Sequence, residues 1–359
     1  MSLTAGLSYI FDAARQPGGL ADPYLTFFAP DGALLARDSD SGGSGNALIT
    51  TVPTASGTYY LGVYDNGVGT GAYTVSAKSA PVMVTTINLN LRVTSANETF
   101  TTGPGNNSVD GAAGTDTVVY SAGLGNYTVT KTATGCTVKD KSGADGTDTL
   151  SNIEALKFTD KSINLQIQAQ AAATPAADVT RLTELYIAFF NRTPDADGLS
   201  YWIASKVAGQ IINQIADAFY SAGSQFSSLT GYTSTMSNAD FVNVIYKNAL
   251  GRKDGPDASG LAYWTSKLSD GSASRGALVS SVLDSAHTYK GDATFGYVAD
   301  LLDNKIVVGK TVAINYGVKY NNTSDAVTNG MAFAAAVTPV STTDAILLVG
   351  VNPADMQPG

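Results

Sequence analysis

Carboxylates gathered in loops are the side chains of this sequence most able to do chemistry. The chain has 30 Asp and Glu against 21 Lys and Arg, which gives a net charge of −9. Hard cations such as Ca²⁺ bind six to eight oxygens from flexible loops of this kind. Asp195 and Asp197 have the i, i+2 spacing of a calcium loop. Asp also caps helix N-termini, and we expect that role for these two residues and for Asp254 and Asp257.

Nucleophilic and redox chemistry have little support in the sequence. There is one histidine, His287, and one cysteine, Cys136, and there is no G-x-S-x-G, H-E-x-x-H, C-x-x-C or Walker pattern. A Ser-His-Asp triad would have to use His287, which we expect to be packed or at the surface. Cys136 is expected to be a small buried hydrophobe. A glycosidase-like carboxylate pair cannot be singled out among so many acids, and we predict that the protein is not an enzyme.

The composition is typical of an exported protein. Only 14% of the residues are charged, against a usual share of about 25%, and Thr, Ser, Gly, Ala and Asn fill the gap. The basic residues are scattered, so neither a nucleic acid nor an anionic membrane is expected as a partner. The longest apolar run, 331–337, is far shorter than the ~20 residues of a membrane span. The first residues lack the features of a signal peptide, so we expect an excised piece or a protein exported without a cleaved leader.

Residues 1–80 are expected to form an antiparallel β-sandwich. Six short apolar or alternating runs are separated by Asp-Gly, Gly-Gly, Ser-Gly and Asn-Gly turns. Alternation along one run places Tyr59 on one face of its strand and Tyr60 and Tyr64 on the other. Exposed tyrosines of this kind would also suit a lectin-like module.

The order of phrases in this block resembles the bacterial pre-peptidase C-terminal domain. The matching phrases are Asp22-Pro23-Tyr24-Leu25, Ala29-Pro30-Asp31-Gly32, Asp38-Ser39-Asp40-Ser41-Gly42-Gly43, Ser56-Gly57-Thr58-Tyr59-Tyr60 and Gly71-Ala72-Tyr73. That family is a small β-sandwich attached to secreted proteases and other exported proteins, and related domains bind calcium or extracellular polymers. The resemblance implies a loop calcium site formed by Asp22, Asp38 and Asp40. The alternative is that Asp and Gly cluster in turns for backbone reasons alone.

Residues 81–166 are expected to form a β segment with turns that resemble calcium-binding repeats. Gly105-Asn106-Asn107 and Gly114-Thr115-Asp116 stand nine residues apart, as in the G-G-x-G-x-D-x-U-x repeat. The phrases DGTDTL at 145–150 and NIEALKF at 152–158 resemble the segment that follows such repeats in exported RTX-type proteins. The resemblance implies a Ca²⁺ site through Asp110 or Asp116. With about two half-repeats present, a full stacked roll is not expected, and turns without metal are the alternative.

The rest of the chain is expected to be helical. Residues 167–177, IQAQAAATPAA, are uncharged and Ala-rich and are predicted to be a linker. Within 178–290 one helical unit is written twice, and each copy closes on Gly-Leu-x-Tyr-Trp, ending at Trp202 and at Trp264. Repetition of this size predicts a duplicated supersecondary unit whose copies bury their apolar faces against each other. Residues 291–359 are predicted to be a C-terminal helical extension.

The duplicated unit resembles a bacterial domain of unknown function, the 4214 family, found in surface-layer, RTX-type and other exported proteins. The matching phrases are Tyr186, Arg192-Thr193-Pro194-Asp195, Gly198-Leu199-x-Tyr201-Trp202, Tyr246, Gly251-Arg252, Asp257 and Gly260-Leu261-x-Tyr263-Trp264. The family implies no reaction. The Tyr-Trp pairs either stack on sugars or pack in the core, and we expect core anchors. Arg192 and Arg252 are expected to pair with the neighbouring acids.

The sequence therefore predicts a multi-domain protein, β then α, with a β-sandwich, a β segment and an all-α repeat domain. We expect a non-catalytic extracellular structural or adhesion module of a secreted or cell-surface bacterial protein, with calcium as a stabilising ion. Its partner would be a cell-surface or extracellular polymer or protein. The alternatives are the accessory region of a secreted hydrolase, such as a protease, and a glycan-binding module. The tail, 342–359, lies where a type I export signal would lie.

Overall fold

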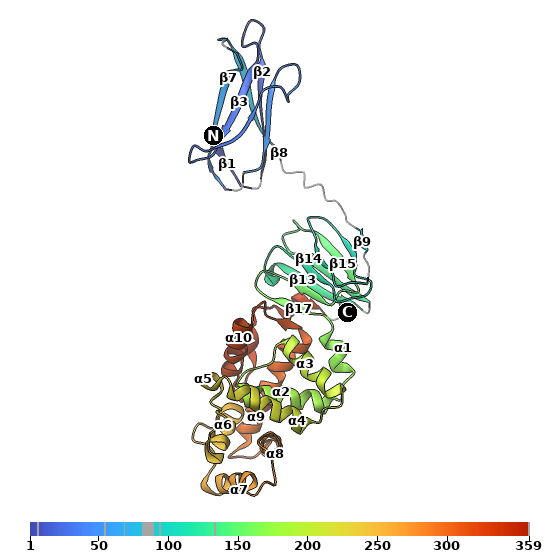
Figure 1. The fold of residues 1–359 in the computed structure, drawn as a ribbon, viewed down its shortest axis with the longest axis vertical. Helices are drawn as coiled ribbons and strands as arrows, with labels where there is room; N and C mark the ends of the chain where they lie inside the picture. The colour runs from blue at the N-terminus through green and yellow to red at the C-terminus, as the bar shows by residue number, and fades with distance from the viewer. Residues whose placement is uncertain are drawn as a thin grey trace. The chain divides into compact units, whose positions relative to one another are not determined.

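The computed structural model describes residues 1–5, 7–53, 55–67, 69–80, 90–92, 95–132 and 134–357. The chain forms two compact units, Met1–Thr86 and Ile87–Gly359 (Figure 1). The first unit is built from strands, and the second begins with strands and continues with helices. This order confirms the predicted β-then-α architecture.

The N-terminal unit is an antiparallel β-sandwich, as predicted. One sheet has the order β5-β2-β8 and the other the order β4-β3-β7. The bounds are β2 Ser8–Arg15, β3 Pro23–Phe28, β4 Leu34–Asp38, β5 Ala47–Thr51, β7 Tyr60–Asp65 and β8 Tyr73–Ala80, with a small pair formed by β1 Ser2–Leu3 and β6 Gly57–Thr58. Phe11 and Phe27 meet across the two sheets, and Tyr59 stacks on Phe27. Tyr60 and Tyr64 are about half exposed on the opposite face of β7, which confirms the predicted alternation.

The second unit starts with three stacked turns of parallel strands. Strands β9 (Asn90–Arg92), β11 (Ser108–Asp110) and β15 (Thr147–Ser151) are neighbours in one sheet. Strands β10 (Thr99–Thr101), β12 (Thr117–Val119) and β16 (Ala155–Lys157) are neighbours in the other. The sequence predicted that two half-repeats would not stack into a roll. They stack together with a third turn, β15–β16, which the chain reaches after the hairpin β13 (Tyr127–Thr132) and β14 (Gly135–Asp140). This turn contains Gly146-Thr147-Asp148, the same step as Gly114-Thr115-Asp116.

The C-terminal segment completes these two sheets. Strand β17 (Ser162–Asn164) pairs with β18 (Val318–Lys319), and β13 pairs with β19 (Met356–Gln357). Side chains from both segments share one core, in which Val118 and Leu156 lie with Phe333 and Val349. The segment was predicted to be a helical extension, and most of it is helical, but it also supplies strands β18 and β19. Its helices are α9 Gly296–Lys310, the π-helical turn η2 Thr311–Asn315, α10 Thr323–Ala336, α11 Thr343–Leu348 and the short 3₁₀ helix η3 Pro353–Asp355.

The predicted linker is structured. Its first half forms α1 (Ile167–Ala172), and α2 begins at Ala176. Ile167 is fully buried, and Gln170 of α1 accepts a hydrogen bond from the Ser200 hydroxyl at 2.5 Å. An uncharged Ala-rich run has high helix propensity, so it forms a helix once Ile167 is buried in the core.

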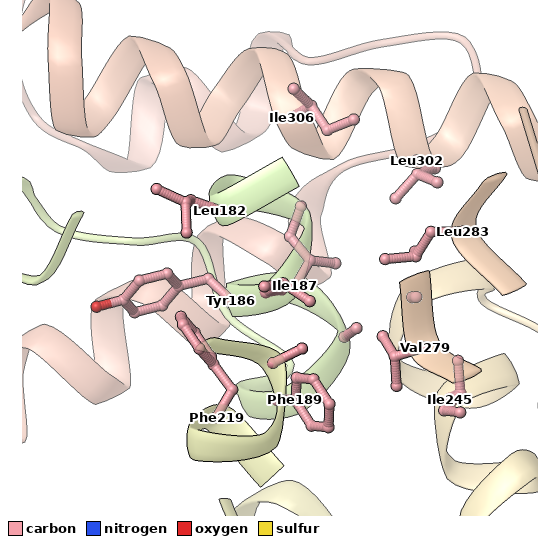
Figure 2. Close-up of a cluster of buried hydrophobic side chains, with 14 of the residues drawn as sticks. Leu182, Tyr186, Ile187, Phe189, Phe219, Ile245, Val279, Leu283, Leu302 and Ile306 are labelled. Carbon is pink, nitrogen blue, oxygen red and sulfur yellow. The ribbon is translucent and has the colours of Figure 1, made fainter. Parts of the chain in front are cut away.

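The duplicated unit forms two sets of three helices around one core. The first repeat is α2 Ala176–Phe190, α3 Ala196–Val207 and α4 Ile212–Ser224, and the second repeat is α6 Asn238–Leu250, α7 Ala258–Ser269 and α8 Arg275–His287, with the short α5 Ser227–Thr230 between them. Figure 2 shows buried side chains of α2, α4, α6, α8 and α9 meeting in this core. The first helix of each repeat ends on a left-handed residue, Asn191 (φ 50°) or Gly251 (φ 67°), which explains the Asn-Arg and Gly-Arg steps of the repeated motif.

Charged groups join the repeats to each other and to α9. The carboxylate of Glu184 on α2 is 2% exposed and meets His287 Nε2 at 2.6 Å and Arg181 at 2.8 Å. The other ring nitrogen of His287 lies 3.3 Å from Asp303 of α9. The hydrogen bond to Glu184 raises the pKa of His287. Lys305 of α9 is buried and donates to the backbone oxygen of Asn248 at 2.8 Å, and burial lowers its pKa to about 8.

Within the ranges given above, no helix is both long and apolar enough to cross a membrane.

Candidate ligand pocket of the second repeat

The carboxylates predicted to bind calcium in the N-terminal unit lie at one end of the sheet β4-β3-β7. Asp22 precedes β3 and its Oδ2 accepts from Asn66 at 2.9 Å. Asp38, at the end of β4, accepts from the backbone N–H groups of Ser41 and Leu48 at 3.0 and 2.8 Å. Asp40 accepts from the Ser39 hydroxyl at 3.2 Å. The contacts of Asp38 and Asp40 shape the β4–β5 loop, whereas Asp22 binds the segment after β7. The structure does not gather the three carboxylates around one point.

Asp116 belongs to a ladder of acidic residues in the stacked turns. Glu98, Asp116 and Glu154 each stand one residue before a strand of the second sheet, β10, β12 and β16. Asp116 Oδ1 accepts from the Glu98 backbone N–H at 2.8 Å, and Glu154 Oε2 accepts from the Asp116 N–H at 2.7 Å. The carboxylates therefore bind backbone donors of the neighbouring turn. Asp116 Oδ2 is buried without a hydrogen-bond partner.

Asp110 lies on the same set of turns but makes different contacts. Its Oδ1 accepts from Ala112 N at 3.0 Å and from Asn152 Nδ2 at 2.7 Å. In the part of the chain that the structure describes, no three His, Cys, Asp or Glu side chains form a group suited to a metal ion. Calcium binding through Asp22, Asp38, Asp40, Asp110 or Asp116 stays a prediction from the sequence.

In the first repeat, the aromatic residues of the motif form a filled cluster. The ring of Trp202 lies 4.4 Å from that of Phe219, and the rings of Tyr186 and Phe190 lie 5.1 and 5.2 Å from Phe219. Figure 2 shows Tyr186 beside Phe219 in this cluster, and their two rings meet edge to face. Trp202 is thus a core anchor, as predicted, whereas its neighbour Tyr201 is 64% exposed.

Other parts of the second unit cover this first cluster. Asp197 in the first turn of α3 binds Lys319 of β18 and Asn164 of β17, each at 2.8 Å. The Thr193 N–H donates to the backbone oxygen of Gly330 in α10 at 3.0 Å. A Cβ at position 330 would approach Thr193 O to 2.7 Å, so glycine is what allows α10 to lie this close. The turn before α3 is therefore enclosed by strands and a helix from distant segments.

In the second repeat, the same motif lines an open pocket of about 570 Å³. Its rings come from the motif and from the segment after α8, and they are Tyr246, Tyr263, Trp264, Tyr289 and Phe295. Tyr263 is 55% and Tyr289 41% exposed, and none of the α7 residues is buried. A pocket of this size with aromatic walls and a few polar groups is typical of ligand sites.

One substitution between the repeats accounts for much of the opening. Phe219 is the eighth residue of α4, and Val282 is the eighth residue of α8. The first helices differ in the same direction, because Phe190 at the end of α2 corresponds to Leu250 at the end of α6. Two rings that fill the first cluster are thus replaced by smaller aliphatic side chains, and both Val282 and Leu250 line the pocket.

Arg252 and Asp257 are the charged residues of the pocket lining. The Arg252 guanidinium lies between two rings, 5.4 Å from the centre of Tyr246 and 5.2 Å from that of Phe295. Over the described residues, no hydrogen-bond acceptor lies within bonding distance of this guanidinium. The sequence predicted that Arg252 and Arg192 pair with the neighbouring acids. The charge of Arg252 helps to lower the pKa of Asp257, but the close contacts of both guanidinium groups are with aromatic rings, as for Arg192 on Tyr186 and Phe190.

Asp257 and its counterpart Asp195 have opposite environments. Asp257 is exposed and caps α7, because its Oδ1 accepts from Gly260 N at 2.7 Å. This bond and the one from the Ser259 hydroxyl lower the pKa of Asp257, so it is ionised at neutral pH. Burial raises the pKa of Asp195, which starts α3 without a capping bond from its side chain. Capping was predicted for both residues and is found for Asp257.

The pocket also has a rigid back wall. The Trp264 indole N–H donates to the Tyr246 hydroxyl at 3.1 Å, which fixes α7 against α6. Trp264 is half-buried and packs against the helical core, as predicted, and it also lines the pocket. The sequence did not predict this pocket. Its signal was present in the aligned repeats, as a valine at the position of Phe219.

Comparison with known proteins agrees with the position of this motif. A family model for a domain of unknown function, DUF4214, matches residues 222–290. No curated protein and no solved structure matches the chain. The matched segment contains α6, α7 and α8 and all of the pocket lining except Phe295 and Val298. The second repeat is therefore the part of this chain that is similar to DUF4214.

Proposed function

We propose that this chain is a non-catalytic structural or adhesion module of an exported bacterial protein, and that its second repeat binds the extracellular partner. The open aromatic pocket carries this proposal. Exposed rings beside the Arg252 guanidinium make up such a surface, since aromatic residues with Arg are enriched where proteins bind partners.

The chemistry of the lining supports binding in preference to catalysis. Asp257 is held by the N-terminus of α7, and Arg252 lies between two rings. The only histidine, His287, has a carboxylate at each ring nitrogen and serves as a contact between helices. Export is supported by the low charged fraction and by the resemblances of the sequence.

Binding to bacterial surfaces tests the proposal. Fluorescently labelled full-length protein is titrated onto intact bacterial cells and onto isolated cell-envelope polymer, with serum albumin as the control protein. We expect saturable binding that Val282→Phe reduces, because the added ring fills the pocket. Absence of saturable binding to both preparations, or turnover of the polymer by the purified chain, would contradict the proposal.

Calcium stabilisation belongs to the same proposal. Among the residues that the structure describes, Asp116 Oδ2 and Asp22 Oδ1 are buried oxygens without hydrogen-bond partners, and a cation would satisfy them. The melting temperature measured with Ca²⁺ and with EGTA tests this point. An unchanged melting temperature would remove calcium from the proposal and leave the binding role intact.

A second candidate function is the accessory region of a secreted hydrolase. The observed N-terminal sandwich favours it, since the family that this block resembles is a β-sandwich attached to secreted proteases. Sequencing the gene on both sides of this chain tests the candidate. A catalytic domain in the same reading frame is the expected result, and a gene without one would contradict it.

A further inference from the structure

We infer that the pocket of the second repeat binds a hexose ring of a glycan. The inference rests on the proposed function and names the chemistry of its ligand.

The walls suit a flat, partly apolar ring. Tyr263 and Trp264 lie with ring centres 4.8 Å apart at an interplanar angle of 71°, so their faces point in different directions. Tyr289 and Phe295, from the segment after α8, form a second angled pair at 5.5 Å and 67°. The face of an aromatic ring carries partial negative charge and attracts the polarised C–H groups on the face of a sugar ring.

The polar groups suit a ligand that both donates and accepts hydrogen bonds. Arg252 offers N–H donors only, and the ionised Asp257 offers acceptors only. Sugar hydroxyls donate and accept at once, so one ring can bind both residues. Tyrosine and serine hydroxyls in the lining, of Tyr289 and Ser285, extend the same property.

Other ligand classes fit this lining less well. A quaternary ammonium group would be repelled by Arg252, although aromatic cages do bind such cations. An aliphatic side chain of a protein partner would desolvate Arg252 and Asp257 without giving either a hydrogen bond. A sugar ring can stack on the aromatic side chains and at the same time hydrogen-bond to Arg252 and Asp257. The lining therefore favours a glycan over a peptide.

The first repeat provides an internal control for the site. Tyr201 occupies the position of Tyr263 and is also exposed, but Phe219 fills the space that Val282 leaves open. A sugar that merely stacks on an exposed tyrosine would bind both repeats. A sugar that needs the pocket would bind the second repeat alone.

Intrinsic fluorescence reports directly on this site, because the chain has two tryptophans and one of them, Trp264, lines the pocket. The full chain is titrated with methyl glycosides of glucose, galactose, mannose and rhamnose, with N-acetylglucosamine, and with glycerol as a non-ring control. We expect a saturable change with at least one sugar. Trp264→Phe removes the change, whereas Trp202→Phe retains it.

Matched variants then locate the binding. Tyr263→Ala should weaken the affinity by roughly ten-fold, which corresponds to the loss of one stacked ring. Tyr201→Ala should leave it unchanged, and both tyrosines are exposed enough for the fold to tolerate the change. Val282→Phe should abolish binding while the melting temperature is kept or raised. Equal loss in the Tyr201 and Tyr263 variants would overturn the assignment of the site.

The outcomes separate this inference from the proposed function. If no sugar gives a saturable change while the labelled protein still binds the cell envelope, the hexose is excluded and the adhesion role stands. Envelope binding that survives periodate oxidation of the glycans but is lost after protease treatment assigns a protein partner and also overturns the inference. Loss of envelope binding altogether removes both proposals.

Discussion

The two repeats of the second unit place the same aromatic motif in opposite environments. In the first repeat, Trp202 and Tyr186 pack around Phe219, and strands β17 and β18 with α10 enclose the turn before α3. In the second repeat, Trp264 and Tyr246 face a pocket of about 570 Å³. The stacked arginine is therefore common to both repeats. Whether the motif lies in a filled cluster or beside a pocket depends on the side chains at the positions of Phe219 and Phe190 and on what covers the motif.

Removal of Phe219 is the strongest way to test this comparison. Phe219→Ala should lower the free energy of unfolding by about 3–5 kcal/mol, because the ring is fully buried among four aromatic neighbours. Val282→Ala should cost only about 1–2 kcal/mol, the value for two buried methyl groups, and less where the side chain borders the pocket. Urea denaturation measures both, and equal losses would show that the repeats are packed alike.

Lys305 tests how α9 joins the second repeat. Burial holds the pKa of Lys305 near 8, below that of a free lysine. At neutral pH the buried ammonium group is still charged, which lowers the free energy of unfolding. Lys305→Met should raise the free energy of unfolding by about 1–2 kcal/mol at pH 7. In the unmodified protein, stability should rise as the pH increases from about 8 to about 10.5, since only the folded state has lost the proton there.

Denaturation curves at several pH values measure how the free energy of unfolding changes between about pH 8 and about pH 10.5. The rise expected for the unmodified protein should be missing in the Lys305→Met variant. Lys310→Met is the matched control, because Lys310 of the same helix donates to Thr180 of the first repeat and is only half-buried. A Lys305 variant that is less stable than the wild type would show that its bond to Asn248 outweighs the cost of burial.

Val282→Phe converts the second repeat toward the first. The added ring should fill part of the pocket and stabilise the protein by about 0.5–2 kcal/mol, the usual gain from filling a cavity. Thermal unfolding measures the change, and Val279→Phe is a control at a fully buried neighbouring position where no cavity is available. A loss of stability for Val282→Phe comparable to that of the control would show that the position has no spare room.

The smallest effect concerns the contact between the repeats at His287. The pKa of this side chain is raised by its hydrogen bond to Glu184, so protonated His287 stabilises the folded state. That contribution is complete below the unfolded pKa of about 6.5 and is lost as the pH rises through the higher folded value. The melting temperature of the wild type relative to His287→Gln should fall over this range, and a constant difference would contradict the assignment.

Local patterns in the sequence were enough to predict the elements. The sandwich was predicted from the turn residues between runs and from the alternation around Tyr60 and Tyr64. Alternation within a strand depends only on the residues of that strand, so it can be read locally. Leu182, Leu185, Tyr186 and Phe189 lie at i, i+3, i+4 and i+7 and form the buried side of α2, since helical periodicity is also local.

Contacts between distant segments decided what the sequence could not predict. Asp197 was expected to cap a helix, but Lys319 and Asn164 bind it, and nothing near position 197 indicates those partners. The stacked turns needed β15 and β16, which lie about 40 residues after β11, so the nine-residue spacing of the first two steps does not include them. Likewise, the pocket exists because Val282 replaces a ring, and this becomes visible only when the repeats are aligned by their buried positions.

The closing strand β19 has a consequence for the order in which this protein folds. The N-terminal sandwich draws its pairings from residues 2–80, so it can form while the rest of the chain is still being made. The second unit pairs Val129 with Met356 and Ile163 with Val318, and such distant pairings make folding slow. Its β core therefore closes only after residue 356 has left the ribosome, and until then the strand edges of β13 and β17 stay unpaired on one side.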